Sequence, residues 1–363
     1  MKIIFYIGNL KKGGAERVVS TLSNKLIKDN EVTIITTTNE MIEYKLDNNI
    51  KVLYLQDCDV KKNFLIKNII YLKRLFNYIR SIKPDIVLGF LPEPSYRLLI
   101  LKPFLKVPVI ISDRNDPKIE YRTFKNKMIM KFLYRRADGF VFQTTEAQQY
   151  FSEKIQNKSI VIANPIDSKF LFSAYNGFDS REFVNVGRLN EQKNQMFLLE
   201  CFKEVIKKYP EYKLLIYGTG DLKKDLDCYI NKNGLNDNIE LCGNVDNIER
   251  VLECKKGFIL SSKYEGMPNA LMEAMAVGMP CISTDCPCGG PRELIKNDRN
   301  GILIENDNKE QLISAIINLI ENKEKCKTLS NNAKREMKNY DCDIITEKWY
   351  NFMKEVCNNG KNN

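Results

Sequence analysis

Residues 257–278 read GFILSSKYEGMPNALMEAMAVG, and this stretch decides the fold. The apolar run at its start is typical of a buried strand, and the following segment predicts an amphipathic helix that ends at Gly278. Pro268 suits the first helical turn, and Gly278 suits a left-handed C-terminal cap. The amides at such a helix start, together with the helix dipole, favour an anion. The stretch therefore predicts a strand–loop–helix unit with an anion site at the loop.

Two carboxylates bracket the predicted anion site. Glu265 lies just before the helix, and Glu273 lies about one turn inside it. A carboxylate cannot hold a phosphate, but it accepts hydrogen bonds from hydroxyl groups. We therefore expect a diphosphate with a hydroxyl-rich group on each side, which describes a sugar nucleotide.

Length and composition indicate a folded protein with two domains. The chain has 363 residues, which is long for one core, and 44% of them are hydrophobic and 28% charged. No apolar run approaches the roughly 20 residues that span a bilayer. The N-terminus enters a strand-like segment, residues 2–7, and lacks the layout of a cleavable signal peptide. We therefore expect a cytoplasmic protein.

The chain contains no histidine and 11 cysteines. Ser-His and Cys-His nucleophilic systems are thereby excluded, so acid–base chemistry must use carboxylates, Lys, Tyr or the substrate itself. Cys281, Cys286 and Cys288 form a tight cluster, but no second cysteine pair matches it as a zinc site would require. We expect reduced thiols in apolar surroundings, no metal ion and no cofactor.

The net charge of +10 is unevenly distributed along the chain. Residues 1–165 carry 28 Lys and Arg against 16 Asp and Glu, whereas residues 166–363 carry 28 against 30. The basic residues concentrate in residues 61–83 and 118–136, where apolar residues recur at helical spacing. Such helices can lie on an anionic membrane surface or pack on the core with solvated basic faces, and both interpretations stay open. Nucleic acid is disfavoured as a partner because its usual binding motifs are absent.

Short β-branched apolar runs alternate with helical patterns, which predicts two doubly wound parallel sheets with helices on both faces. Strands are expected at residues 3–7, 32–36, 51–55, 86–89, 109–111, 139–142 and 159–162, and then at 183–186, 213–216, 239–242, 258–260, 281–283 and 301–304. A turn-rich stretch separates a first domain, 1–166, from a second, 178–342. The chain then reads as helices only, at about 309–321, 324–338 and 343–356.

Other loops that follow predicted strands contain glycines. Gly13 and Gly14 follow the first strand and open a helix, where a ligand can approach the backbone closely. Gly218 lies in a similar strand-to-helix loop, and residues 284–293 form a loop rich in glycine and proline. Because open α/β sheets bind ligands at the carboxyl ends of their strands, we expect these loops to share one site.

A basic loop follows the first strand of the second half. Gly187 begins it, and it contains Arg188 and Lys193. Sugar transfer most needs stabilisation of the charge on the leaving group, and two preorganised cations would supply it without a metal. We therefore expect both side chains to point at the diphosphate.

With these residues in place, the chain resembles the family 4 glycosyltransferases, retaining enzymes with two facing Rossmann-like domains in the GT-B architecture. The resemblance covers about residues 1–356, and the pair Glu265 and Glu273, with seven residues between them, is its most specific element. It implies that Glu265 contacts hydroxyls of the donor sugar and Glu273 the ribose, while Arg188 and Lys193 hold the diphosphate. Glu265, Arg188 and Lys193 are thus the expected catalytic residues.

The resemblance also implies further contacts with the donor and a separate binding role for each domain. The first domain would bind the acceptor and would receive the last helix, about 343–357, and the second would bind the donor. The remaining expected donor-binding residues are Gly13, Gly14, Gly187, Gly218, Gly266, Met267, Pro268, Asn269 and Ala270.

The chain departs from the family pattern at one place. Many members carry a histidine after the strand that matches residues 109–111, with a proposed role at the donor sugar or transition state. Here that place contains Asp113, Arg114 and Asn115, with Arg114 about where the histidine would be. These three residues are candidates for the same space, and a strand-end turn built on Asp, Asn and Pro is the alternative.

The sequence predicts an enzyme that moves a sugar from a nucleotide-diphosphate donor, a UDP-sugar, to a saccharide acceptor with retention of configuration. From the basic first half we expect a polyprenyl-diphosphate-linked acceptor at the inner membrane surface, as in capsule, O-antigen or other polysaccharide assembly. A sugar-nucleotide epimerase on the same architecture and a non-catalytic nucleotide- or glycan-binding protein are the alternatives. A nicotinamide-dependent oxidoreductase is disfavoured because no strand-linked G-x-G-x-x-G occurs.

Overall fold

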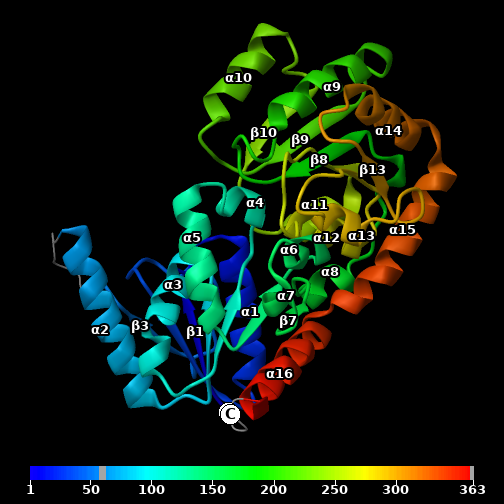
Figure 1. Cartoon of the computed structure of the whole chain (residues 1–363). Coiled ribbons are helices and arrows are strands. Elements are labelled where there is room, and N and C mark those ends of the chain that lie inside the picture. Colours follow the sequence, from blue (N-terminus) through cyan, green and yellow to red (C-terminus); the bar gives the residue numbers. More distant parts are fainter. Residues whose placement is uncertain (57–62, 360–363) are drawn as a thin grey trace. The chain divides into compact units, whose positions relative to one another are not determined.

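The computed structural model describes residues 1–56 and 63–359, which divide into two compact units (Figure 1). Unit 1 comprises Met1–Pro165 together with the C-terminal residues from Cys342 onward, and unit 2 comprises Ile166–Asp341. Lys61 and Lys62, which begin the first basic stretch, lie outside the described residues.

Unit 1 is built on a seven-stranded sheet in the order β3-β2-β1-β4-β5-β6-β7. Every strand pair in it is parallel. The order reverses at β1, which pairs with both β2 and β4, and such a switch point leaves a crevice at the carboxyl ends of the strands. The strands are β1 (Lys2–Ile7), β2 (Glu31–Thr36), β3 (Lys51–Tyr54), β4 (Ile86–Phe90), β5 (Val109–Ser112), β6 (Gly139–Phe142) and β7 (Ser159–Val161).

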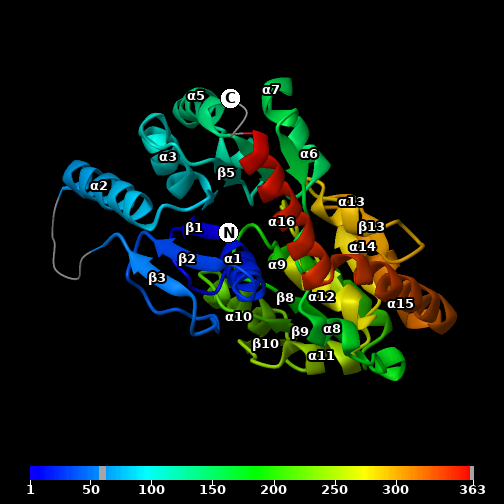
Figure 2. The ribbon, with the colours of Figure 1, turned by 90° about the horizontal axis from the view of Figure 1, so that it is seen from below.

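Helices cover both faces of this sheet. One face packs against α1 (Gly14–Leu26) and α16 (Cys342–Asn359), around a core that includes Phe90 and Trp349. The other face carries α2 (Phe64–Ile82), α3 (Pro92–Leu101) and α5 (Phe124–Leu133), with α3 in contact with both of the others (Figure 2). Shorter helices complete the unit: η1 (Lys102–Phe104), α4 (Pro117–Glu120), η2 (Tyr134–Arg136), α6 (Thr145–Gln149) and α7 (Glu153–Gln156).

Unit 2 repeats the topology with six parallel strands in the order β10-β9-β8-β11-β12-β13. The strands are β8 (Glu182–Val186), β9 (Lys213–Tyr217), β10 (Ile239–Gly243), β11 (Gly257–Leu260), β12 (Cys281–Thr284) and β13 (Ile302–Ile304). Its helices are α8 (Ser168–Phe172), η3 (Gly177–Asp179), α9 (Gln195–Lys208), α10 (Lys223–Lys232), α11 (Ile248–Cys254), α12 (Asn269–Val277), α13 (Gly290–Leu294), α14 (Lys309–Glu321), α15 (Lys323–Met337) and η4 (Lys338–Tyr340). The predicted pair of doubly wound parallel sheets is thereby confirmed.

Helix α12 differs in one respect from the amphipathic helix that we expected. Gly278 takes the predicted left-handed conformation as the C-cap, with φ of 95°, and Pro268 is the N-cap residue rather than part of the first turn. Every residue from Leu271 to Val277 is buried, because α8, α11 and α15 surround the helix. A helix enclosed on all sides is apolar all round, and Glu273 is the exception among these seven residues.

The two basic stretches form α2 and α5, and both bury one apolar face while exposing further apolar side chains. Met130 and Leu133 of α5 are buried, whereas Phe124, Met128 and Phe132, each four residues apart, are exposed. The structure therefore combines features of both interpretations: each helix packs on the core, and each also presents apolar groups outward. Over residues 1–56 and 63–359, no helix has the length and apolar content that crossing a bilayer requires.

Replacing Trp349 by Ala should destabilise unit 1 by about 3–5 kcal/mol, the usual cost of emptying a large aromatic site in a core. Trp349 is fully buried and stacks on Phe90 with ring centroids 5.6 Å apart, which fixes α16 to the sheet. Urea denaturation followed by far-UV circular dichroism measures the change. Lys348→Ala, at an exposed site on the same helix, is the matched control, and an unchanged midpoint for Trp349→Ala would contradict this assignment of α16.

Candidate functional site

The switch point of unit 2 brings together the loops that follow β8 and β11. The two strands are neighbours in the sheet although β9 and β10 lie between them in sequence. Two hydrogen bonds then join the loops: the backbone amide of Lys263 donates to the carbonyl of Gln192 over 2.8 Å, and the side-chain Oγ of Ser261 donates to the carbonyl of Lys193 over 2.9 Å. The basic loop and the Glu265 loop therefore form one continuous surface.

Lys193 and Glu265 form an ion pair at this surface, in which Glu265 is buried and Lys193 is half-buried. The ammonium of Lys193 donates to Glu265 Oε1, and Ser262 Oγ donates to the same oxygen over 2.6 Å. The amide of Glu265 is itself held by the carbonyl of Pro287 at 2.8 Å. The pair therefore presents a fixed carboxylate for hydroxyl groups beside a fixed cation for an oxyanion.

Arg188 follows Gly187 and is exposed, and no side chain in the described part of the chain forms an ion pair or hydrogen bond with its guanidinium. Its backbone carbonyl accepts a hydrogen bond from Gln195 Nε2 over 3.0 Å, which fixes the main chain while the side chain stays available. An anchored backbone with an unengaged guanidinium suits recognition of a phosphate from solvent.

Glycines allow the backbones of these loops to approach one another. Gly218 has φ of 133°, and a Cβ atom there would lie 2.0 Å from the carbonyl oxygen of Gly187. A Cβ atom on Gly290 would lie 1.7 Å from the carbonyl oxygen of Gly266. Both contacts require glycine, so the loops after β8, β9, β11 and β12 are packed against one another at one sheet edge.

The start of α12 lies in the same group of loops. Pro268 provides no side-chain cap, so the first-turn amides are not covered by a capping side chain. Met267 is buried, whereas Asn269 and Ala270 are half-buried. Glu273 is buried within the helix, about one turn from its start. Every residue that we predicted in unit 2 for the donor thus lies on or next to this surface.

Burial keeps the neighbouring thiols protonated. It raises the pKa of Cys286 to about 12, and the nearby Glu265 carboxylate acts in the same direction. No cysteine in residues 1–56 and 63–359 forms a disulfide. Cys281, Cys286 and Cys288 are all buried, and Cys286 is the one whose electrostatics link it to Glu265, whereas Cys281 begins β12 at the opposite edge of the sheet.

In unit 1 the predicted Gly13–Gly14 loop follows β1 and opens α1. Gly13 is the N-cap, and its amide and carbonyl both contact the hydroxyl of Tyr44, at 2.9 and 2.7 Å. A Cβ atom on Gly13 would lie 2.2 Å from Glu16 Oε2. The loop is therefore held tightly at the switch point of its own sheet.

The three residues at the position of the family histidine separate from one another. Asp113 is buried and accepts hydrogen bonds from the hydroxyls of Tyr121 and Tyr134 over 2.7 and 2.8 Å. Arg114 is buried elsewhere, where it donates to Ser112 Oγ over 3.4 Å and to Asn164. Asn115 is exposed and donates to Glu120 over 3.2 Å. Of the three, Asp113 thus belongs to a tyrosine network rather than to an open surface.

Sequence reasoning missed several residues that shape these sites. Ser262 lies three positions before Glu265 in a polar run, and only its contact with the carboxylate reveals its role. Asn164 lies at the start of the turn-rich stretch between the predicted domains, yet it is buried and also accepts from Gln143 over 2.8 Å. Nothing in the local pattern distinguishes such an asparagine from one in an ordinary turn.

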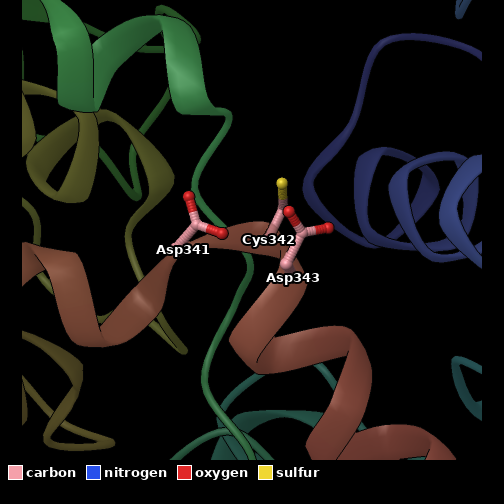
Figure 3. Close-up of side chains that lie close together, drawn as sticks. All are labelled: Asp341, Cys342 and Asp343. Atoms are coloured by element: carbon pink, nitrogen blue, oxygen red, sulfur yellow. The ribbon is translucent and has the colours of Figure 1, made fainter.

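Two acidic side chains and a thiol lie close together where the chain passes from unit 2 into unit 1: Asp341, Cys342 and Asp343 follow one another, and α16 begins at Cys342 (Figure 3). Their ligand atoms lie within 4.8 Å of one another. Asp343 forms an ion pair with Lys25 at 2.7 Å, and Asp341 accepts from Ser168 Oγ at 3.4 Å. Protein groups thus already engage both carboxylates, which explains the group as an anchor of α16.

Comparison with protein families matches both halves of the chain. Residues 12–170 match the model described as Glycosyltransferase Family 4, and residues 172–336 match Glycosyl transferases group 1. An uncharacterised glycosyltransferase of Methanocaldococcus jannaschii is 30% identical over 76% of this chain and 80% of that protein. A Campylobacter jejuni α-1,4-N-acetyl-D-galactosaminyltransferase, whose name gives an undecaprenol-diphosphate-linked glycan as acceptor, is 28% identical over 99% of both chains.

Solved structures share the fold at low sequence identity. Anabaena HepE in complex with UDP and glucose superposes with a TM-score of 0.84 at 17% identity, over 98% of this chain and 99% of that one. Sucrose-phosphate synthase from Thermosynechococcus elongatus gives 0.84 at 15% identity over the same shares. These likenesses support the architecture of both units.

Asp113→Asn should flatten the pH dependence of stability between about pH 4 and pH 6. Burial raises the pKa of Asp113 from 3.8 to about 6, despite the two tyrosine donors. Between these values the folded state binds more protons than the unfolded state, so stability falls as the pH rises, by roughly 3 kcal/mol, and then levels off. Urea unfolding of both proteins at pH 4.0–7.0 measures the difference.

Asp29→Asn, at an exposed acid of the same unit, controls for the loss of one carboxylate. Parallel stability curves for wild type and Asp113→Asn would show that Asp113 ionises as easily in the folded state as in the unfolded state.

Proposed function

Because the chain belongs to the family 4 glycosyltransferases, we propose that it transfers a sugar from a UDP-sugar to a lipid-linked saccharide, with retention of anomeric configuration. One observation carries the proposal: the ion pair of half-buried Lys193 with buried Glu265 lies beside the start of α12, with the unengaged Arg188 on the adjoining loop. This arrangement offers cations and amides for a diphosphate and a carboxylate for the hydroxyls of a sugar.

The roles of the residues follow from their surroundings. Arg188, Lys193 and the first-turn amides of α12 bind the diphosphate and stabilise the negative charge that grows on it as it leaves. Glu265 accepts hydrogen bonds from the donor sugar, and its orientation is fixed by Lys193 and Ser262. Glu273, buried within α12, accepts from the ribose. Gly187 and Gly218 keep the neighbouring backbone close enough to enclose the nucleotide.

The reaction breaks the bond between the anomeric carbon and the diphosphate and forms a bond from that carbon to the acceptor oxygen on the same face. The acceptor hydroxyl must lose a proton, and the chain has no histidine to take it. We assign the proton to an oxygen of the departing diphosphate, which lies on the face where the acceptor attacks. Arg188, Lys193 and the helix amides supply the positive charge at the diphosphate, so the proposed mechanism needs no metal ion.

The acceptor class is supported by relatives and by the surface of unit 1. The names of two Campylobacter jejuni relatives and of an Escherichia coli galactosyltransferase specify undecaprenol-diphosphate-linked saccharides, and the last also specifies UDP-Gal as donor.

In unit 1, α5 exposes Phe124, Met128 and Phe132 at 80%, 49% and 63% of their surface. These side chains lie between the exposed lysines 125, 127 and 131, and α5 contains no acidic residue. We propose that this face of α5, the α5 stripe, contacts the anionic inner face of the plasma membrane, where such an acceptor lies.

Glu265→Gln should lower the transfer rate by about 10²–10³-fold, because it removes the charge that orients Lys193 and binds the sugar. Arg188→Gln should weaken donor binding and also slow transfer, because it removes a cation that holds the diphosphate and stabilises its charge as it leaves. A thermal-shift screen of nucleotide sugars first identifies the donor, since a bound donor stabilises the fold. UDP release in the presence of polyprenyl-diphosphate saccharides then measures turnover.

Glu191→Gln is the matched control, because Glu191 lies in the same loop and its exposed side chain pairs with Lys263. Full activity of both Glu265→Gln and Arg188→Gln would place catalysis elsewhere. An epimer formed from the donor alone, without acceptor, would instead identify a sugar-nucleotide isomerase.

Replacing Phe124, Met128 and Phe132 together by Ser should abolish flotation with liposomes that contain anionic lipids at low salt, because the change removes the apolar part of the α5 stripe while keeping its charge. Phe172→Ser, at an equally exposed phenylalanine in unit 2, should leave flotation unchanged. Wild-type protein that does not float at low salt would refute the membrane contact without bearing on transfer to soluble acceptors.

A further inference from the structure

Arg114 is a buried cation without a counter-charge. Its side chain lies just after β5, is 6% exposed and rests over the ring of Phe90, 5.9 Å from the ring centroid. Its hydrogen bonds go to the neutral side chains of Ser112 and Asn164, and Nε has no partner. Among the residues that the structure describes, no carboxylate forms an ion pair with it, because the adjacent Asp113 binds the two tyrosines instead.

Such an arrangement is costly for the isolated protein. A guanidinium taken out of water needs an anion or a full set of hydrogen bonds to offset the lost hydration. Burial is the cause that lowers the pKa of Arg114 to about 9, which still leaves the group charged at neutral pH. The second buried arginine of this unit, Arg97, shows the usual solution, since it pairs with Glu93 and also binds Asn68 and Tyr6.

The location of Arg114 indicates what could supply the missing charge. It lies at the carboxyl end of β5, and Gln143 and Asn164 follow β6 and β7 at the same edge of the sheet. Arg114 and Gln143 both donate to Asn164 Oδ1, so neutral groups fix the guanidinium in place. Open α/β sheets bind their ligands at this edge.

We propose that Arg114 binds an oxyanion of the substrate, a phosphate or a carboxylate, which completes its charge balance when the substrate is bound. The inference rests on the proposed function, because it assigns an anionic group to the ligand of that reaction. Three sources share this chemistry: the diphosphate of the nucleotide sugar, the diphosphate of a lipid-linked acceptor, and the carboxylate of an acidic sugar. In each case Arg114 acts as a binding residue, and its unbalanced charge lowers the stability of the protein when no ligand is bound.

Arg114→Gln tests the inference, because glutamine can still donate to Asn164 but carries no charge. The variant should melt at the same temperature as the empty wild type or higher, while losing at least tenfold in affinity for its anionic ligand. Arg114→Lys keeps the charge but not the planar fork of donors. Its affinity for the anionic ligand should therefore lie between those of the wild type and Arg114→Gln. Arg97→Gln is the matched control: it breaks an ion pair and should lower the melting temperature.

The ligands tested identify the source of the anion. A loss of affinity for UDP itself assigns Arg114 to the donor diphosphate. A loss restricted to UDP-glucuronate, with UDP-glucose unaffected, assigns it to a sugar carboxylate, and a raised KM for the polyprenyl-diphosphate acceptor alone assigns it to the acceptor. A lower melting temperature for Arg114→Gln with unchanged affinities and KM values would overturn the inference and leave Arg114 a structural residue.

The inference and the proposed function can fail separately. If Arg188→Gln weakens donor binding and Arg114→Gln alters neither the affinities for UDP, UDP-glucose and UDP-glucuronate nor the KM for the acceptor, the transferase proposal stands. The proposed anion site is then refuted. If the wild type binds no nucleotide sugar, titration with inorganic pyrophosphate still decides: stabilisation of wild type that is absent in Arg114→Gln supports the site, and equal responses refute it.

Discussion

The pairing of β8 with β11 is the constraint on which the site in unit 2 depends. These strands meet only because the sheet grows in one direction from β8 to β10 and in the other from β11 to β13. Their carboxyl ends then place Lys193 and Glu265 within contact, although they lie on separate loops. Glu265 is buried and Lys193 half-buried, so the carboxylate in particular would be unfavourable there without its partner. The sheet order thus determines the chemistry: a different strand order would separate the cation from the carboxylate.

Three cations, the buried Arg97 and Arg114 and the half-buried Lys193, show how the fold treats charge near its ligand edges. Lys193 has Glu265 and Arg97 has Glu93, so protein groups balance both. Arg114 has only neutral partners. The sequence places an acid next to Arg114, yet Asp113 turns toward Tyr121 and Tyr134. The structure therefore keeps the adjacent carboxylate away from Arg114, which is understandable if a ligand supplies the negative charge.

Much of the fold could be predicted because buried parallel strands have a simple signal. Runs such as residues 86–90 and 109–112 are apolar and β-branched throughout, since both of their faces are covered, and turns or helical patterns bound them. The glycines of the loops could also be identified from the sequence, and the structure shows that a position such as Gly218 has no room for a side chain. The extent of burial of α12 could not be predicted from the sequence, because it depends on helices α8 and α15 from distant parts of the chain.

Side-chain partnership was the part of the site that the sequence concealed. Lys193 and Glu265 were expected to contact different parts of a ligand, and their contact with each other follows only from the sheet order. The divergence of Asp113 and Arg114 has a local cause: successive residues of an extended chain point to opposite sides, so these neighbours, just after the end of β5, enter different surroundings. A sequence motif identifies the residue types at a sheet edge. The direction in which each side chain points, and the partner that it contacts, follow only from the backbone structure.

The exposed α5 stripe and the buried Arg114 lie on one continuous segment of unit 1. Arg114 follows β5 directly, α4 comes next, and α5 then begins at Phe124 with its exposed apolar groups. If the α5 stripe contacts a membrane and Arg114 binds an anion, a short connection joins the lipid-facing surface to the ligand edge of the same sheet. An amphiphile with a diphosphate between its lipid and its saccharide has the same order of groups: apolar, anionic, then hydroxyl-rich. This correspondence favours the acceptor diphosphate among the three sources of charge for Arg114, because the donor diphosphate already has Arg188, Lys193 and the start of α12.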